Sequence, residues 1–307
     1  MHHLALAQEA ATTLGGRNAH PLTAVVGGVS RYLKNDSYER LEEIAGITVQ
    51  FLESLAAFFR ERVWVNPGVM KKYSEISIQP MCGLSFDTSD VESGDHAQKD
   101  EFVVTDKSGK ETMRFSVEKA LEKIDVATEA WSYLPFAFFR EKGWQGVTSE
   151  ADSMFFTGPL ARINSCKSMD TEKAEKERMT MIDHLGPFPH FHILAAFWAL
   201  IPEALRSAEK MAQLCRREKL TGPFTRKIPK NMGNETFAAL EGPQGIIYHH
   251  YQVDSRGLVE NIRILDTSVE NNALRCLTAQ KAHEVSIADK DSWEKTKNRI
   301  EASLLPF

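Results

Sequence analysis

The longest stretch of helical periodicity lies between Ser37 and Arg62. Mostly apolar side chains recur there every three or four residues, and the charged side chains fall largely between them: Leu41, Ile44, Thr48, Leu52, Leu55 and Phe59. This spacing places the repeating positions on one face of a helix, which predicts a long amphipathic helix. A second long helix is predicted for His190–Arg217, in which Pro202 should produce a kink or a new start.

Shorter helical patterns occur throughout the chain. The first, residues 1–14, should end at Gly15-Gly16, because glycine adopts the backbone conformation that terminates a helix. The same reasoning predicts helices over three further segments: Val117–Trp131, about Thr171–Ile182, and Ser292–Leu304.

The period changes to two in a few short segments. Between about residues 75 and 114, Ile76 and Ile78 alternate with polar side chains, and the turn Asp106–Gly109 follows an apolar run; the acidic stretch Asp87–Asp100 is predicted to be a solvated loop. Residues 245–254 and 257–266 should form a second hairpin. The predicted fold is mainly α with small antiparallel β hairpins (α+β). We expect a single domain over residues 1–307, with a β-rich insertion at about 75–114 and a β hairpin at about 245–266.

Charge and composition exclude several classes of protein. A net charge of -5 argues against a nucleic-acid binder, which usually carries a basic surface. The most apolar run, Ile193–Ile201, is too short to span a bilayer, so no membrane span is expected. No signal peptide is recognisable at His2-His3, which favours a cytoplasmic location.

The residue types that carry chemistry are thinly spread. The four cysteines lie far apart and form no CxxC pair, so they are expected to be reduced, mostly buried thiols: Cys82, Cys166, Cys215 and Cys276. On a strand, His249 and His250 would point to opposite faces and could not bind one ion together. No phosphate-binding glycine loop and no nucleophilic Gly-x-Ser-x-Gly occurs. These patterns indicate no more than a soluble, mainly helical protein.

Several sequence blocks, taken together, are much more specific. They lie at Gly15–Pro21 (Gly-Gly-Arg-Asn-Ala-His-Pro) with Val25–Val29, at Trp131–Tyr133, at Gly158–Asn164 (Gly-Pro-Leu-Ala-Arg-Ile-Asn), at Glu241–Gly245 running into Ile247–Tyr251, and at Asn271-Asn272. This set, in this order, resembles the large (alpha) subunit of nickel-iron hydrogenases. The residues of these blocks are most similar to those of the cytoplasmic branch of the family, whose members reduce deazaflavin or nicotinamide cofactors or supply electrons to heterodisulfide reductase.

The resemblance implies a fold, an activity and partners. It implies the helical core of a hydrogenase large subunit and an oxidoreductase that oxidises hydrogen reversibly. Electrons would pass to an iron-sulfur small subunit within a heteromeric complex, with further redox subunits as candidate partners. The family's cofactor is a nickel-iron centre held by the thiolates of two CxxC motifs, which suit these metals.

This chain departs from the family at the metal ligands. It begins after the first CxxC motif would have passed, and it ends at Pro306-Phe307, about where Asp-Pro-Cys would start. The expectation is a large subunit truncated at both ends, with no metal ligands of its own. Such a chain would bind no cofactor alone and would be inactive alone.

The resemblance also assigns candidate site residues. Gln244 stands where the family suspends an arginine over the metals; it can donate hydrogen bonds but carries no charge. Thr267 or Ser268 matches a hydroxyl, outside the metal ligands themselves, that hydrogen-bonds an iron cyanide. Arg17 and His20 match the loop that faces the small subunit's proximal cluster.

Three hypotheses remain open at this point. The first is a true large subunit whose ends are encoded elsewhere or were lost, which the absence of both motifs favours. The second is a degenerate, non-catalytic scaffold or electron-transfer subunit of a redox complex, which Gln244 favours because it is a substitution inside an intact block. The third is an unrelated helical binding protein. The sequence therefore leaves open whether this chain is an enzyme.

Overall fold

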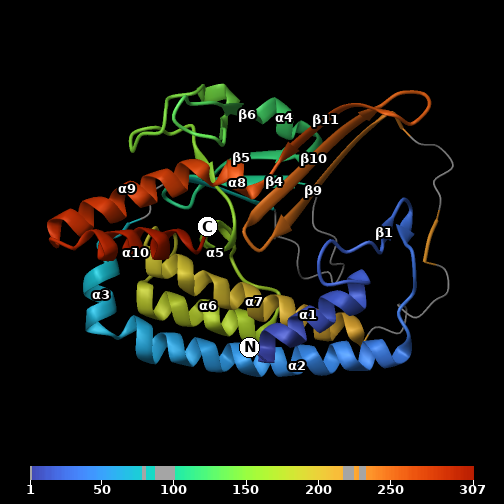
Figure 1. Cartoon of the computed structure of the whole chain (residues 1–307), viewed down its shortest axis with the longest axis horizontal. Coiled ribbons are helices and arrows are strands. Elements are labelled where there is room, and N and C mark those ends of the chain that lie inside the picture. The colour runs from blue at the N-terminus through green and yellow to red at the C-terminus, as the bar shows by residue number, and fades with distance from the viewer. Residues whose placement is uncertain (1, 78–80, 87–100, 217–224, 228–232) are drawn as a thin grey trace.

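The computed structural model describes residues 2–77, 81–86, 101–216, 225–227 and 233–307 (Figure 1). Its α-helices are α1 (His2–Gly15), α2 (Asn35–Phe58), α3 (Pro67–Tyr73), α4 (Ala120–Lys123), α5 (Pro159–Ser165), α6 (Glu172–Leu185), α7 (Ile193–Cys215), α8 (Thr267–Glu270), α9 (Asn272–Ala288) and α10 (Trp293–Leu304). The π-helix Phe59–Trp64 continues α2, and short 3-10 turns cover Val117–Lys119 and Arg140–Lys142.

The strands are short and form small sheets. They are β1 (Ala24–Val25), β2 (Gly28–Val29), β3 (Cys82–Phe86), β4 (Glu101–Thr105), β5 (Glu111–Ser116), β6 (Ile124–Ala127), β7 (Phe136–Phe139), β8 (Phe155–Phe156), β9 (Glu235–Gly242), β10 (Gly245–Val253) and β11 (Val259–Leu265). The orders are β1-β2, β5-β4-β3-β8, β6-β7 and β11-β10-β9, and pairing is antiparallel except between β3 and β8. The predicted α+β class is confirmed.

A helical layer forms one side of the molecule. Helices α2, α6 and α7 lie side by side in Figure 1, and α1 packs on α2. Trp198 of α7 is fully buried in the core of this layer. Of the predicted positions of α2, Leu55 is exposed. The buried stripe also includes Ala45, Val49 and Ala56, which the predicted pattern did not name. The buried stripe includes small residues, which permit helices to approach closely.

The two long helices differ from their predicted bounds in informative ways. The α-helical part of the first ends at Phe58 and continues as a π-helix. Helix α7 begins only at Ile193, because the Nδ1 atom of His192 accepts a hydrogen bond from the Leu194 amide at 3.1 Å and caps the helix. The helix runs through Pro202 to Cys215. Pro202 therefore does not mark a new helix start.

Both predicted hairpins form. The turn between β4 and β5 closes with the Gly109 amide donating to the Asp106 carbonyl at 2.9 Å, and Gly109 has a φ of 81°. The predicted loop Asp87–Asp100 lies outside the described residues. The hairpin β10–β11 gains a third strand, β9, which the sequence reasoning did not predict. The side chain of Ile76 is buried, and the described part of its segment makes an isolated bridge between Ser77 and His192. The predicted Ile78 lies outside the described residues.

The predicted helix over Val117–Trp131 is helical only as far as Lys123 and is wrong beyond it. After α4 the chain extends into β6, which pairs with β7, and Ile124 lies opposite Phe139. Both side chains are buried. A short segment in which apolar and charged side chains alternate irregularly is compatible with a helix or a strand, and burial against the aromatic strand β7 outweighs local helix propensity.

A second core lies between the sheets and positions the elements that matter below. Side chains of β3, β4, β5, β7, β8 and β10 meet in it, including Phe102, Phe139, Phe155, Ile246 and Tyr248. Helix α5 contacts both β3 and α7, and α8 contacts both β7 and β10. These two short helices therefore join the sheets to the rest of the molecule. Within the described part of the chain, no helix is long and apolar enough to cross a membrane.

Candidate functional site

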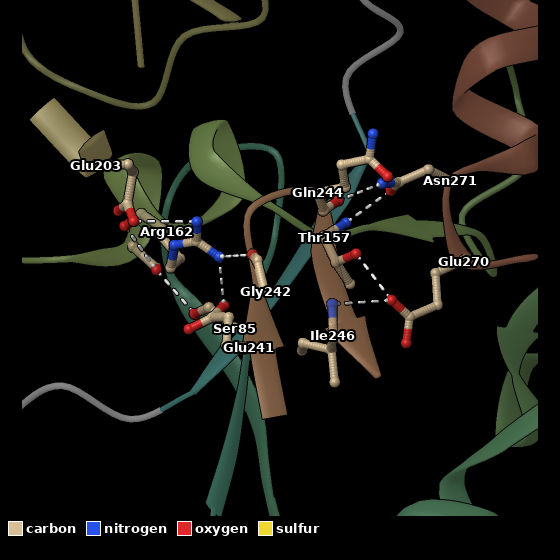
Figure 2. Close-up of polar contacts among 11 residues, drawn as sticks. Ser85, Thr157, Arg162, Glu203, Glu241, Gly242, Gln244, Ile246, Glu270 and Asn271 are labelled. Atoms are coloured by element: carbon tan, nitrogen blue, oxygen red, sulfur yellow. Dashed lines mark hydrogen bonds and ion pairs between the residues drawn. The ribbon is translucent and has the colours of Figure 1, made fainter. Parts of the chain in front are cut away.

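Two backbone segments touch directly at the centre of the site (Figure 2). Gly158 has a φ of 103°, and a Cβ atom there would lie 2.8 Å from the carbonyl oxygen of Gln244. Gly245 has a φ of 146°, and its Cβ would lie 2.1 Å from Oγ1 of Thr157. A side chain at either position would force the segments apart, so both positions require glycine.

The side chain of Asn271 holds the Thr157 and Gln244 segments in contact. Its Oδ1 accepts a hydrogen bond from the Thr157 amide at 2.9 Å, and its Nδ2 donates to the Gln244 carbonyl at 3.0 Å. The side chain is fully buried, so these partners satisfy both ends of its amide. Asn271 thereby holds the Gly158–Asn164 block against the Glu241–Gly245 block.

The neighbouring Asn272 brings in a further sequence block. Its Nδ2 donates to the carbonyl oxygens of Leu134 and Pro135 at 3.1 and 3.2 Å and lies 3.4 Å from Oγ of Ser132. This loop carries the Trp131–Tyr133 block. The asparagine pair therefore joins blocks that lie more than a hundred residues apart in the sequence.

An ion-pair triad that is largely, but not fully, buried lies beside the contact. Arg162 projects from α5, and its Nη2 lies 3.0 Å from Oε2 of Glu203 on α7. Its Nη1 lies 3.3 Å from Oε1 of Glu241 and donates to the Gly242 carbonyl at 3.2 Å. Figure 2 shows the guanidinium between the two carboxylates. One cation thus ties α5 to both α7 and β9.

Two carboxylates sharing one cation cannot both be fully stabilised as anions. Burial raises the pKa of Glu241 to about 7; Arg162 opposes this effect, and the negative charge of Glu203 adds to it. Burial by itself would lower the pKa of Arg162, but the two carboxylates hold it above its usual range. At neutral pH the triad therefore keeps a proton on Glu241 for a substantial part of the time.

A second buried carboxyl group lies on the other side of the contact. Glu270, at the end of α8, is 2% exposed. Its Oε2 accepts hydrogen bonds from Oγ1 of Thr157 at 2.8 Å and from the Ile246 amide at 3.3 Å. Burial raises the pKa of Glu270 to about 8, although both hydrogen bonds act to lower it. Glu270 is therefore largely protonated at neutral pH.

The predicted residue Gln244 lies at the β9–β10 turn with an exposed side chain. Thr267 is close by, since its Cγ2 lies 3.1 Å from the position of a Cβ on Gly245. Ser268 lies in the first turn of α8, where its amide donates to Asp266. The structure thus places Thr267 beside the Gln244 turn, and the roles of Gln244, Thr267 and Ser268 remain predictions.

Arg17 and His20 lie elsewhere, in the exposed loop between α1 and β1. Nε of Arg17 donates to the His20 carbonyl at 2.6 Å, and His20 has a φ of 51°. Their predicted role, facing the cluster of a small subunit, remains a prediction too.

The thiols do not converge. The four cysteines are free thiols of intermediate exposure that lie on β3, after α5, at the end of α7 and on α9: Cys82, Cys166, Cys215 and Cys276. Burial raises the pKa of each thiol, to about 12 for Cys166, which disfavours the thiolate that a metal needs. Among the described residues, no group of three or more His, Cys, Asp or Glu side chains could hold a metal ion. The side chains that the structure describes do not fit a nickel-iron centre.

The histidine pair behaves as its position on a strand predicts. His250 is 6% exposed and its Nε2 bonds to Oε1 of Glu235 at 2.8 Å, whereas His249 bonds to Oη of Tyr251 at 2.9 Å. Sequence reasoning missed Glu203 and Glu270. Glu203 is a single carboxylate in an otherwise apolar stretch, whereas Glu270 stands among polar residues, and nothing local connects either one to Arg162 or Thr157.

Comparison with known proteins places this arrangement in context. No model of a known protein family matches the chain. An iron-sulfur subunit of the F420-non-reducing hydrogenase from Archaeoglobus profundus is 28% identical over 300 residues, which cover 96% of this chain and 60% of that protein. The beta subunit of the NAD-reducing hydrogenase HoxS from Cupriavidus necator is 22% identical over 286 residues, covering 90% of this chain and 56% of that protein.

Solved structures show the same fold. An NAD+-reducing [NiFe]-hydrogenase in the H2-reduced state superposes with a TM-score of 0.83 at 22% identity, covering 98% of this chain and 64% of that one. A Ni-Fe-Se hydrogenase from D. vulgaris Hildenborough gives a TM-score of 0.57 at 16% identity, over 88% of this chain and 59% of that one. The chain thus has a hydrogenase large-subunit fold and hydrogenase sequence relatives. It spans about 60% of the length of the curated relatives it matches.

Proposed function

We propose that this chain, a relative of hydrogenase large subunits in sequence and fold, serves in reversible hydrogen oxidation and passes electrons to an iron-sulfur small subunit. One observation carries the proposal. The blocks Trp131–Tyr133, Gly158–Asn164, Glu241–Gly245 and Asn271-Asn272 meet at one place in the fold. Blocks that lie so far apart in the sequence and yet meet in the fold are explained if together they form one functional site. The cytoplasm, where redox partner subunits are available, is the proposed location.

The described residues supply position and protons rather than metal ligands. Gln244 is held at the tip of a turn by the glycine contact and by Asn271. Behind the turn, burial raises the pKa of two carboxyl groups, to about 7 for Glu241 and to about 8 for Glu270. A nickel-iron centre would supply the hydrogen chemistry, and its thiolates are not among these side chains, so we assign no step at the metal.

The main expectation about the rate of hydrogen oxidation concerns Gln244. An arginine at this turn would place a positive charge near an anionic centre, where a low dielectric magnifies each charge. A neutral amide keeps a hydrogen-bond donor and loses the charge. Removing a comparable preorganised group lowers enzymatic rates on the order of a hundred- to a thousand-fold.

A chimaera tests the proposal. Residues 1–307 would be fused between the CxxC-bearing ends of a close active relative and produced with maturation proteins and the small subunit. We expect stoichiometric nickel and hydrogen oxidation, with Gln244→Arg at least about a hundred-fold faster than Gln244. Residues 1–307 alone should bind no stoichiometric nickel.

Two controls make the outcomes decisive. The active relative with its own arginine changed to glutamine measures the same effect in a native background. A folded, nickel-containing chimaera that turns over no hydrogen with either residue would refute the proposed activity. Equal rates for Gln244 and Gln244→Arg would instead show that Gln244 merely completes the turn.

A further inference from the structure

The Gln244 turn is held by two adjacent side chains of different chemistry. Asn271 binds the Gln244 carbonyl and the Thr157 amide. Glu270 binds the Ile246 amide and the Thr157 hydroxyl. These hydrogen bonds therefore hold the turn on both sides of Gln244 and connect it to Thr157, in the segment before α5. Asn271 cannot titrate, whereas Glu270 can.

The surroundings of Glu270 favour its neutral form. Helix α8 packs on β7, whose residues Phe136–Phe139 carry no ionisable group, and on β10, where the buried neighbour is Ile246. The charges that act on Glu270 are Asp266, at the start of its own helix, and Glu241 on β9, and both are negative. On α9 the nearby cation Arg275 is engaged by the Phe307 carbonyl at 2.7 Å. An ionised Glu270 would thus be a buried charge beside two carboxylates.

We propose that Glu270 is a proton-dependent positioning residue: it holds the Gln244 turn against Thr157 while protonated and releases the turn when it ionises. In the neutral form, the carbonyl oxygen of the carboxyl group accepts both hydrogen bonds. In the ionised form, desolvation drives the side chain toward water, and the Ile246 amide loses its buried acceptor. The consequence for catalysis rests on the proposed function, because it is Gln244 that would move.

The direction of the pH effect follows from the raised pKa of about 8. Below that pH the carboxyl group is neutral as long as the turn is closed, whereas in an open turn it meets water and ionises as an ordinary glutamate does. Between 4.5, the pKa of an unperturbed glutamate, and about 8, the open form has lost the proton that the closed form keeps, so each pH unit favours the open form by about tenfold; above about 8 both forms are ionised and the preference levels off. Asn271 does not titrate, so its hydrogen bonds form at every pH. They determine how far the turn stays protected from hydrogen exchange when Glu270 is ionised.

Hydrogen exchange of the intact 307-residue chain measures this opening. Exchange at the Ile246 amide would be followed from about pH 6 to about pH 10 and corrected for the intrinsic, pH-dependent exchange rate, with the β4–β5 hairpin as an internal control. In the unmodified chain we expect protection of Ile246 to fall about tenfold per pH unit as the pH rises to about 8 and to level off above that, while the hairpin stays constant. In Glu270→Gln, whose amide oxygen accepts the same bonds, protection should not depend on pH.

Asn271→Ala provides the matched control. This substitution removes the hydrogen bonds that do not titrate. It should therefore lower the protection of the Ile246 amide at every pH and leave the dependence of that protection on pH unchanged. Protection of Ile246 that stays constant up to the highest pH in the unmodified chain overturns the proposal, as does an equal slope in Glu270→Gln. The assay requires no metal and no partner, so its failure would leave the proposed function standing, and inactivity of the chimaera would leave this result standing.

Discussion

Replacing Glu241 by glutamine should stabilise the protein at high pH and hardly affect it at low pH. The pKa of Glu241 is about 7 in the folded chain against 4.5 for an unperturbed glutamate. Because the folded-state pKa is raised, the folded chain binds a proton that the unfolded chain has already lost. The free energy of unfolding of the unmodified chain therefore falls as the pH rises from 4.5 to about 7 and stays lower above that.

The magnitude follows from the same difference. At about 1.4 kcal/mol for each pH unit, ionising Glu241 in the folded state costs about 3 kcal/mol. Glutamine imitates the neutral carboxyl group, so Glu241→Gln should raise the free energy of unfolding by up to about 3 kcal/mol near pH 9 and by little near pH 5. Arg162→Met should act in the opposite direction near pH 9, by about 3–5 kcal/mol, because it leaves two buried carboxylates without a cation.

Urea unfolding followed by tryptophan fluorescence measures both effects, since Trp198 is fully buried in the helical layer. Glu260→Gln, at an exposed position of β11, is the matched control and should change the midpoint little at either pH. If Glu241→Gln destabilised the chain equally at low and high pH, the carboxylate would be a required anion, and the reasoning about the shared cation would be wrong.

Two further predictions concern packing and the surface. Gly245→Ala should lower the stability by more than about 3 kcal/mol, since the new Cβ would lie 2.1 Å from Oγ1 of Thr157, whereas Gly257→Ala, with open space around its Cβ, should cost only about 1 kcal/mol; thermal melts compare them. Phe58 and Leu55 of α2 are 56% and 36% exposed, so the chain should bind an apolar dye, and Phe58→Ser with Leu55→Ser should reduce the bound dye; unchanged dye fluorescence would contradict this.

Much of the fold was predictable because it depends on local pattern. The spacing of apolar side chains predicted α2, α6, α7 and α10, since a helix repeats its faces every 3.6 residues or so. Turn glycines predicted the end of α1 and the turns of the β4–β5 and β10–β11 hairpins, because only glycine adopts those backbone angles easily. The family resemblance, read from short blocks, predicted the large-subunit fold.

The elements that failed depend on partners distant in sequence. The segment that forms β6 carries a pattern compatible with helix, and only β7 decides its conformation. Strand β9 was not predicted, although it completes the sheet that carries Gln244. Strand pairing is a contact between segments, so local propensity decides it only in part.

The candidate site divides in the same way. The sequence by itself determined that Gly158, Gly245 and Asn271 belong to recognisable blocks and that Gln244 stands at an arginine position. Only the tertiary structure decided that Glu203 and Glu241 share one guanidinium and that Glu270 lies buried against Thr157. The physical reason is that a carboxylate's pKa and partners depend on burial and on charges brought near by folding, and neither is encoded in the residues beside it.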